Sequence, residues 1–205
     1  MQDNIIIRFL TKVFDLILLN ILWIVFSIPI ITIGASTTAL YTVTLKMVSN
    51  EEGYIAKEFW KAFKENLKQG TIIWLVLWMI GMALGIDCYV IQRYFLGIRS
   101  LIMITIGIIG FIWMFEMIFV FPVLAKFDNS IMNTMKNAIM IPVARLPYAF
   151  LTIAVTVICI VVTLLSEATI MTGAVIWSVI GVATLTYANS FFIVKIFEPY
   201  LNIEE

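Results

Sequence analysis

The sequence contains no histidine and only two cysteines among its 205 residues. Without histidine, the protein lacks the commonest metal ligand and the commonest general base at neutral pH. Cys88 and Cys159 lie within apolar runs and have no ligand-type neighbours, which argues against a zinc site or a disulfide framework. The sequence also has no catalytic triad, phosphate-binding loop or acidic metal-ligand cluster. We therefore expect no catalytic residues, no metal and no cofactor, and we predict that the protein is not an enzyme.

Charged residues are also scarce, at 13% of the chain, and they balance, because 13 Lys and Arg residues face 13 Asp and Glu residues. Soluble domains carry about 25% charged residues. A chain without a basic surplus offers no electrostatic footprint for nucleic acid, so we do not expect nucleic acid as a partner. The hydrophobic fraction of 62% points instead to the lipid bilayer.

What the sequence has is a series of apolar runs long enough to cross a bilayer, whose hydrocarbon core of about 30 Å needs about 20 helical residues. Backbone polar groups in lipid must be paired within the protein, so these runs are expected to be helices. The predicted fold is all-α, a polytopic membrane helical bundle that forms one integral membrane domain over residues 1–205. The predicted spans are about 13–33, 71–91, 101–123, 147–165 and 169–194.

Proline and glycine mark the expected ends of two spans. Pro29 and Gly34 are predicted to break the first span, and Pro122 to end the third, because proline removes a backbone donor and glycine favours turns. The sequence leaves open whether residues 30–36 re-enter the membrane or form the exit of the span.

Two long loops between the spans are predicted to contain amphipathic helices over about 36–48, 52–69 and 129–141. Ser49 and Glu52 have the spacing of a capping box, which would open the second of these helices. In that helix Phe59 and Phe63 share one face with Trp60 alongside, and lysines fill the other face. This pattern is typical of a helix at the membrane–water boundary, and it also fits a docking surface for a partner.

Basic residues in short loops predict orientation, because they concentrate on the cytoplasmic side. Most of the 13 Lys and Arg residues fall in the two long loops and near the C-terminal end. This distribution predicts that the N-terminus is outside and the C-terminus and both long loops are cytoplasmic. The basic residues assigned to the outer side are Arg8, Lys12, Arg93 and Arg99.

Polar side chains inside predicted spans are functional candidates, because burying them in lipid is unfavourable. Glu116 is the charged residue deepest in an apolar run, and Asn189 or Tyr187 of the last span lies at a similar depth. We predict that Glu116 pairs with one of them, either to lock two helices together or to couple a proton or substrate. Asn20 in the first span is a candidate for an interhelical hydrogen bond.

The run Ser27–Tyr41, with Glu51–Tyr54 and Phe63–Gln69, resembles the YesL family, a group of small bacterial membrane proteins of unknown function. The resemblance implies a multi-pass protein of the bacterial cytoplasmic membrane. It also implies an association with carbohydrate uptake, because members are often encoded beside oligosaccharide ABC transporter and glycosidase components. It implies no established activity and no catalytic residues.

Two functions therefore compete. The first is an accessory or assembly subunit of a carbohydrate ABC importer, which would dock beside permease subunits through Phe59, Trp60 and Phe63. The alternative is a stand-alone small-molecule channel or secondary transporter that uses the intramembrane carboxylate of Glu116. A homo-oligomer is compatible with either function.

Overall fold

The computed structural model describes residues 5–94 and 99–201. Within these two ranges the chain is helical and contains no strand, which confirms the predicted all-α fold. The side chains of Arg93 and Arg99, which entered the prediction of orientation, lie outside those that the structure describes. The elements in chain order are α1 (Ile5–Ser27), the 3-10 turn η1 (Ile30–Thr32), α2 (Ile33–Ser49), α3 (Ile55–Tyr94), α4 (Arg99–Lys126), α5 (Ile131–Val143), α6 (Leu146–Leu164), α7 (Glu167–Ile176), the π-helical stretch η2 (Trp177–Gly181) and α8 (Val182–Leu201).

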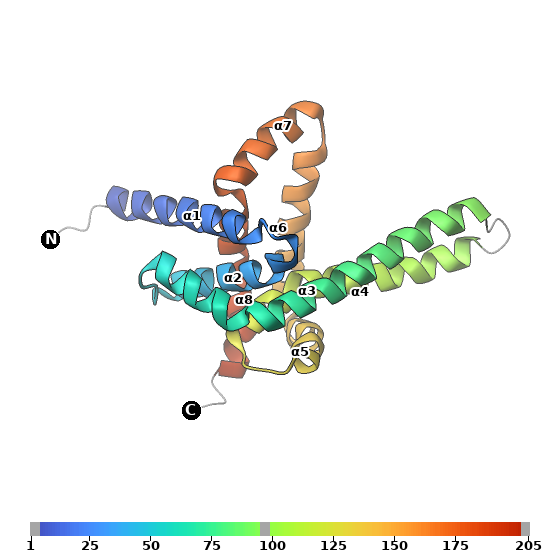
Figure 1. Ribbon diagram of the computed structural model, residues 1–205, viewed down its shortest axis with the longest axis horizontal. Helices are drawn as coiled ribbons and strands as arrows, with labels where there is room; N and C mark the ends of the chain where they lie inside the picture. Colours follow the sequence, from blue (N-terminus) through green and yellow to red (C-terminus); the bar gives the residue numbers. More distant parts are fainter. Residues whose placement is uncertain (1–4, 95–98, 202–205) are drawn as a thin grey trace.

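Three arms project from a central hub around α2. Helix α1, the α3–α4 hairpin and the α6–α7 hairpin point in different directions, while α8 runs through the hub and α5 lies beside it (Figure 1). Five helical stretches are long and apolar enough to cross a membrane, which supports a multi-pass membrane protein. They are Ile6–Ser27, Ile55–Ile91, Ser100–Lys126, Leu146–Leu164 and Glu167–Leu201.

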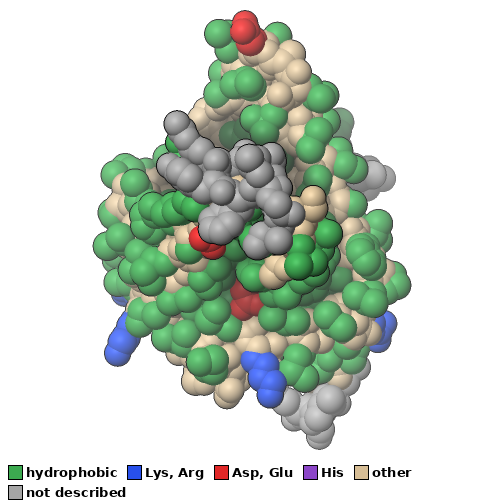
Figure 2. Space-filling view, turned by 90° about the vertical axis from the view of Figure 1, so that its right-hand side faces the viewer, with side chains coloured by type: hydrophobic (Ala, Val, Ile, Leu, Met, Phe, Trp, Pro, Cys, Tyr) green, Lys and Arg blue, Asp and Glu red, His purple; other side chains and the backbone are tan. Residues whose placement is uncertain are grey.

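The surface agrees with a membrane setting. Hydrophobic side chains cover most of the face that looks along the α3–α4 hairpin, and the Lys and Arg side chains on that face lie in its lower half (Figure 2). Apolar residues are also exposed along the arms, among them Phe14 on α1 and Phe150 on α6. In water such a continuous apolar surface would be unfavourable, whereas in lipid it is solvated.

Helix α2 is the buried centre of the fold, which differs from the amphipathic loop helix expected over 36–48. It packs against α1, α3, α4 and α8. Its polar residues do not prevent burial, because Thr38 donates to the Gly34 carbonyl at 2.8 Å and Thr42 to the Thr38 carbonyl at 3.0 Å. These two hydroxyls are thereby paired within their own helix, which lowers the cost of burying them.

Glycine serves close packing here, not helix breaking. Gly34 lies inside α2, and α1 has already ended at Ser27, so the prediction that Gly34 breaks the first span is wrong. A Cβ atom on Gly34 would lie 2.2 Å from the Gly70 carbonyl oxygen, and one on Gly70 would lie 2.8 Å from Ala35. Both glycines therefore allow the backbones of α2 and α3 to touch. Gly70 is held in this contact within a continuous helix and does not separate two helices. The helices expected over 52–69 and 71–91 are therefore one 40-residue helix, α3.

The two prolines named above behave differently. Pro29 follows the end of α1 in extended conformation, with φ −73° and ψ 104°, so the first helix does break there. Pro122 lies inside α4, which continues to Lys126, so the predicted helix end is wrong. Its neighbours Phe121 and Val123 are both buried in the hub, and this packing holds the last turn despite the missing backbone donor.

Side-chain caps begin two of the later helices. The Ser130 hydroxyl accepts a hydrogen bond from the backbone N–H of Asn133 and begins α5, in the loop where a helix over 129–141 was expected. Ser166 and Thr169 form a capping box at the start of α7. Such caps satisfy backbone donors that lack partners in the first helical turn.

Candidate functional site

Glu116 is the clearest polar anomaly in the apolar interior. The residue is only 5% exposed, and neither carboxyl oxygen has a hydrogen-bond partner among the described residues. It lies on α4, nearly three turns before the end of that helix at Lys126. A buried carboxyl group without a partner is unfavourable, so it is usually found where a ligand or a proton completes its surroundings.

The side chain of Glu116 borders a groove of about 470 Å³ between α3, α4 and α5, called the Glu116 groove below. The indole N–H of Trp113 donates to the Leu77 carbonyl at 2.8 Å and ties α3 to α4 at this place. Gly81 leaves room for the indole, because a Cβ atom there would lie 2.7 Å from the ring. The other lining residues are Ile80, Ile109, Ile112, Met132, Met135, Lys136 and Ile139.

Asn189 belongs to a different polar group, so the predicted pairing of Glu116 with Asn189 is wrong. Its amide donates to the Thr156 hydroxyl at 2.9 Å and so links α8 to α6. One residue on, Ser190 shares a 2.9 Å hydrogen bond with Thr44 of α2. The face of α8 that carries Asn189 and Ser190 is turned toward α6 and α2, whereas Glu116 faces α3 and α5.

Tyr187, the other partner proposed for Glu116, also lies elsewhere. Its ring packs edge-on against Phe191 and has the Lys12 ammonium 5.9 Å from its centroid. It therefore belongs to the surface where α1 meets α8, and contributes to the surroundings of Lys12.

Asn20 forms the predicted interhelical hydrogen bonds, and its partner is the π-helical stretch η2. The side-chain amide donates to the carbonyls of Trp177 and Ser178, both at 3.0 Å. Its oxygen accepts from the backbone N–H of Ala183 at 3.0 Å. A π-helical turn leaves some backbone groups without their regular helical hydrogen bonds. The Asn20 amide, with its two donors and one acceptor, pairs with these groups here.

The aromatic face predicted for docking is largely internal. Phe59 is 0% exposed and Phe63 is also buried, and both rings pack against Phe26 of α1. The proposed docking role of these two residues is therefore wrong. Trp60 remains 45% exposed and has the Lys64 ammonium 5.3 Å from its ring. Phe59 and Phe63 do share an apolar face, but that face is covered by α1.

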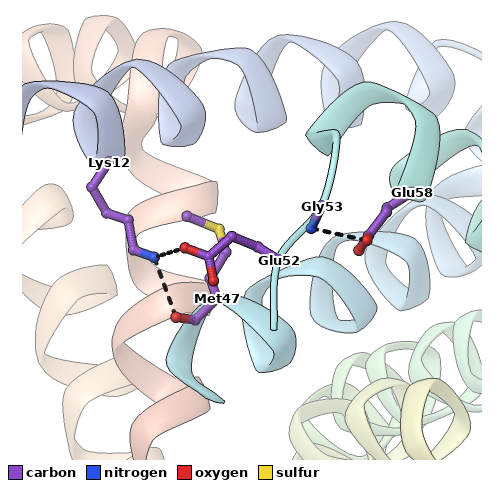
Figure 3. Close-up of polar contacts among 5 residues, drawn as sticks. All are labelled: Lys12, Met47, Glu52, Gly53 and Glu58. Carbon is purple, nitrogen blue, oxygen red and sulfur yellow. Dashed lines mark hydrogen bonds and ion pairs between the residues drawn. The ribbon is translucent and has the colours of Figure 1, made fainter. Parts of the chain in front are cut away.

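An ion pair that the sequence did not reveal joins the start of α1 to the loop before α3. Lys12 forms a short ion pair with Glu52 and also donates to the Met47 carbonyl at 3.2 Å (Figure 3). Glu58 accepts from the Gly53 backbone N–H at 3.0 Å, which closes the loop. Glu52 is therefore a partner of Lys12 and does not form the predicted capping box, and α3 begins at Ile55. Lys12 and Glu52 are 40 residues apart, and no local pattern indicates their contact.

Lys12 affects the charge state of Glu52. Partial burial of Glu52 opposes its ionisation, but the hydrogen bond and the positive charge of Lys12 outweigh this effect and lower the pKa of the carboxyl group. The pair is therefore charged at neutral pH.

The same contact corrects the prediction of orientation. Lys12 was assigned to the outer side and the loop containing Glu52 to the cytoplasmic side. Two side chains in direct contact cannot lie on opposite sides of a bilayer about 30 Å thick. The assignment of these two residues to opposite sides is therefore wrong.

Comparison with known proteins agrees with the resemblance noted in the sequence. The family model described as "Protein of unknown function, DUF624" matches residues 16–88. The uncharacterized protein YteU of Bacillus subtilis (strain 168) is 29% identical over 143 residues, which cover 67% of this chain and 64% of YteU. The uncharacterized protein YesL of the same organism is 26% identical over 160 residues, or 75% of each chain.

The predicted resemblance to the YesL family is confirmed. The stretch that matches the DUF624 model runs from α1 through α2 into α3 and includes Asn20, Phe59 and the Gly34–Gly70 contact. Glu116 lies outside this stretch. The YesL-type relatives carry no assigned activity, and no solved structure matches the chain.

Proposed function

We propose that this protein is an accessory or assembly subunit of a carbohydrate ABC importer in the bacterial cytoplasmic membrane. The likeness to YesL-type proteins supports the membrane setting, and the association of that family with oligosaccharide uptake supports the class of partner. The arms of the fold supply the surfaces that such a role needs.

The observation that carries this proposal is an apolar notch between the α3–α4 and α6–α7 arms. The notch, called the α4–α6 notch below, contains no polar surface. Helices in membranes associate through close van der Waals packing, and the exposed rings of Phe111 and Phe150 give this notch apolar surface that another helix can contact. Its lining residues are Phe111, Ile112, Phe115, Ile139, Val143, Leu146, Ala149, Phe150 and Ile153.

A second surface supports contact near the membrane boundary. Trp60 is exposed on α3, and the neighbouring lysines Lys57, Lys61 and Lys64 are exposed around it. An aromatic ring among lysines suits the headgroup region. Of the predicted docking residues, Trp60 is the one that the fold leaves available.

Co-purification tests the proposal. The tagged protein is recovered from native membranes in mild detergent, and associated permease subunits are quantified by mass spectrometry. We expect stoichiometric permease subunits with the wild type, and a several-fold loss when Phe111 and Phe150 are both replaced by alanine. Ile160→Ala, also exposed on α6 but outside the notch, is the matched control and is expected to retain them. Recovery of the protein alone, or only as a homo-oligomer, would contradict the accessory role.

A second candidate function is favoured by one observation, the unpartnered carboxyl group of Glu116. A channel or secondary transporter could use such a group to couple a proton or a cation. This function predicts solute flux in proteoliposomes that Glu116→Gln abolishes. Flux that is absent, or that persists in the variant, would remove this candidate.

We also propose that the start of α1 and the end of α8 both face the cytoplasm. Five crossings would place them on opposite sides, and α2, whose far end lies at the contact of Lys12 with Met47, supplies a sixth crossing by running back along α1. Lys12 contacts Glu52, and the ends of α2, α4 and α8 meet at one pocket lined by Lys46, Lys126 and Leu201. Lys12, Lys46 and Lys126 therefore lie at the same end of the fold, and basic residues favour the cytoplasmic side. In a background without native cysteines, Thr11→Cys and Glu51→Cys should both resist an impermeant maleimide in intact cells. Labelling of either position from outside would contradict this orientation.

A further inference from the structure

The Glu116 groove contains two charged side chains, Glu116 and Lys136, that have no part in the accessory role proposed above. One wall carries a carboxyl group that is nine-tenths buried and has no partner among the described residues. An ionised carboxylate in apolar surroundings is strongly unfavourable until a donor reaches it. The group is therefore poised to accept a hydrogen bond or a positive charge from a molecule in the groove.

The remaining walls suit hydrocarbon. Ile80 and Ile109 line the groove from α3 and α4, and both are partly exposed at the surface. Met132 and Met135 line it from α5, and methionine side chains adapt their shape to flexible apolar ligands. The groove is open to the surface of the protein, so an acyl chain can enter it from outside.

Lys136 supplies the second polar feature. It is exposed, lines the same groove as Glu116, and belongs to none of the ion pairs found among the described residues. A lysine at the edge of a membrane protein is a common partner for the phosphate of a lipid. The groove therefore pairs a buried acid with a base at its rim, between apolar walls.

We propose that the Glu116 groove binds a phospholipid with a primary amine in its headgroup. The ammonium group donates to the Glu116 carboxylate, the phosphate contacts the Lys136 ammonium, and the acyl chains lie along Ile80 and Ile109. This arrangement neutralises both charges of the site and both charges of the headgroup. It does not depend on which protein occupies the α4–α6 notch.

Lipid titration of the purified full-length protein, followed by native mass spectrometry, tests the proposal. Phosphatidylethanolamine is compared with phosphatidylcholine of the same acyl chains, because the two share the phosphate and only the first has ammonium N–H donors. We expect phosphatidylethanolamine to bind about tenfold more tightly, the ratio that one charge-assisted hydrogen bond provides. Equal affinity for the two lipids, or tighter binding of phosphatidylglycerol, would overturn the proposal.

Variants locate the site. Glu116→Gln keeps the size of the side chain and is expected to remove the preference for phosphatidylethanolamine, whereas Lys136→Gln should weaken both lipids. Glu65→Gln removes an exposed carboxylate elsewhere on the surface and should change neither affinity. Ile80→Trp fills the groove and should block both lipids while leaving the notch intact. An unchanged lipid preference in correctly folded Glu116→Gln protein would also overturn the proposal.

Discussion

A few polar side chains fix which helices of this apolar chain contact one another. Asn20 is fully buried, yet both ends of its amide are paired with the backbone of η2 and α8. Lys12 and Glu52 hold the start of α1 against the loop before α3. Glu116 is the exception, because its oxygens remain without partners among the described side chains and backbone. The first three are explained by structure, and the fourth points to a ligand.

Replacing Asn20 with leucine should lower the free energy of unfolding by about 2 kcal/mol or more, because buried backbone groups of η2 and α8 lose their partner. Denaturant titration in detergent micelles measures this change. The control is Asn66→Leu, since the Asn66 amide donates only to the Ala62 carbonyl of its own helix. Equal changes in the free energy of unfolding for the two substitutions would show that the contact of Asn20 with η2 adds no stability.

The ion pair of Lys12 with Glu52 should make stability depend on pH. Lys12 lowers the pKa of Glu52 in the folded state, so the stabilisation is complete above the unfolded pKa of about 4.3 and is lost as the pH falls through the folded pKa. At pH 7 we expect Glu52→Gln to cost about 0.5–1 kcal/mol, because the pair is partly exposed. The difference between wild type and variant should vanish in acid. A difference that persists there would contradict this explanation.

At the scale of elements, the contact between α2 and α3 organises the hub. Gly34 and Gly70 bring the two backbones together, and α2 then fills the space between α1, α4 and α8. Both glycines lie within the stretch that matches the family model, whereas the Glu116 groove is built mainly from α4 and α5, outside it.

Gly34→Ala should destabilise the fold by about 1–3 kcal/mol, because the new methyl group meets the Gly70 backbone, which cannot move aside as a side chain can. Gly107→Ala is the control, since no atom lies within 4 Å of a Cβ placed there and alanine favours the helix. Thermal melting should therefore separate the two variants in opposite directions. A similar melting temperature for both would show that α2 and α3 do not rely on close backbone contact.

The sequence predicted these elements well where the signal is local. Apolar runs indicated the spanning helices, and the helix expected over 129–141 corresponds to α5. Burial of α2 was missed because its threonines look polar in the sequence, whereas Thr38 and Thr42 are paired with their own backbone. Which face of a helix meets a neighbour depends on tertiary packing, which the sequence does not show. The sequence therefore predicts Phe59 as a docking residue, although its ring packs against α1.

The whole molecule is a hub with three apolar arms, and this arrangement could not be read from the spans alone. Hydropathy gives the length of each helix, but neither its direction nor its neighbours. The long-range contacts that set the directions join residues far apart in the chain, such as Asn20 with Trp177 and Lys12 with Glu52. The α4–α6 notch exists only because the arms diverge, and the accessory role rests on it.

Photo-crosslinking in native membranes tests this central claim most directly. A photoreactive amino acid is placed at Phe150, inside the α4–α6 notch, and in a matched control at Ile160, exposed on the same helix outside it. Crosslinks to carbohydrate ABC permease subunits from position 150, and not from position 160, are the predicted result. Crosslinks from position 150 only to lipid or to a second copy of this chain would contradict the account.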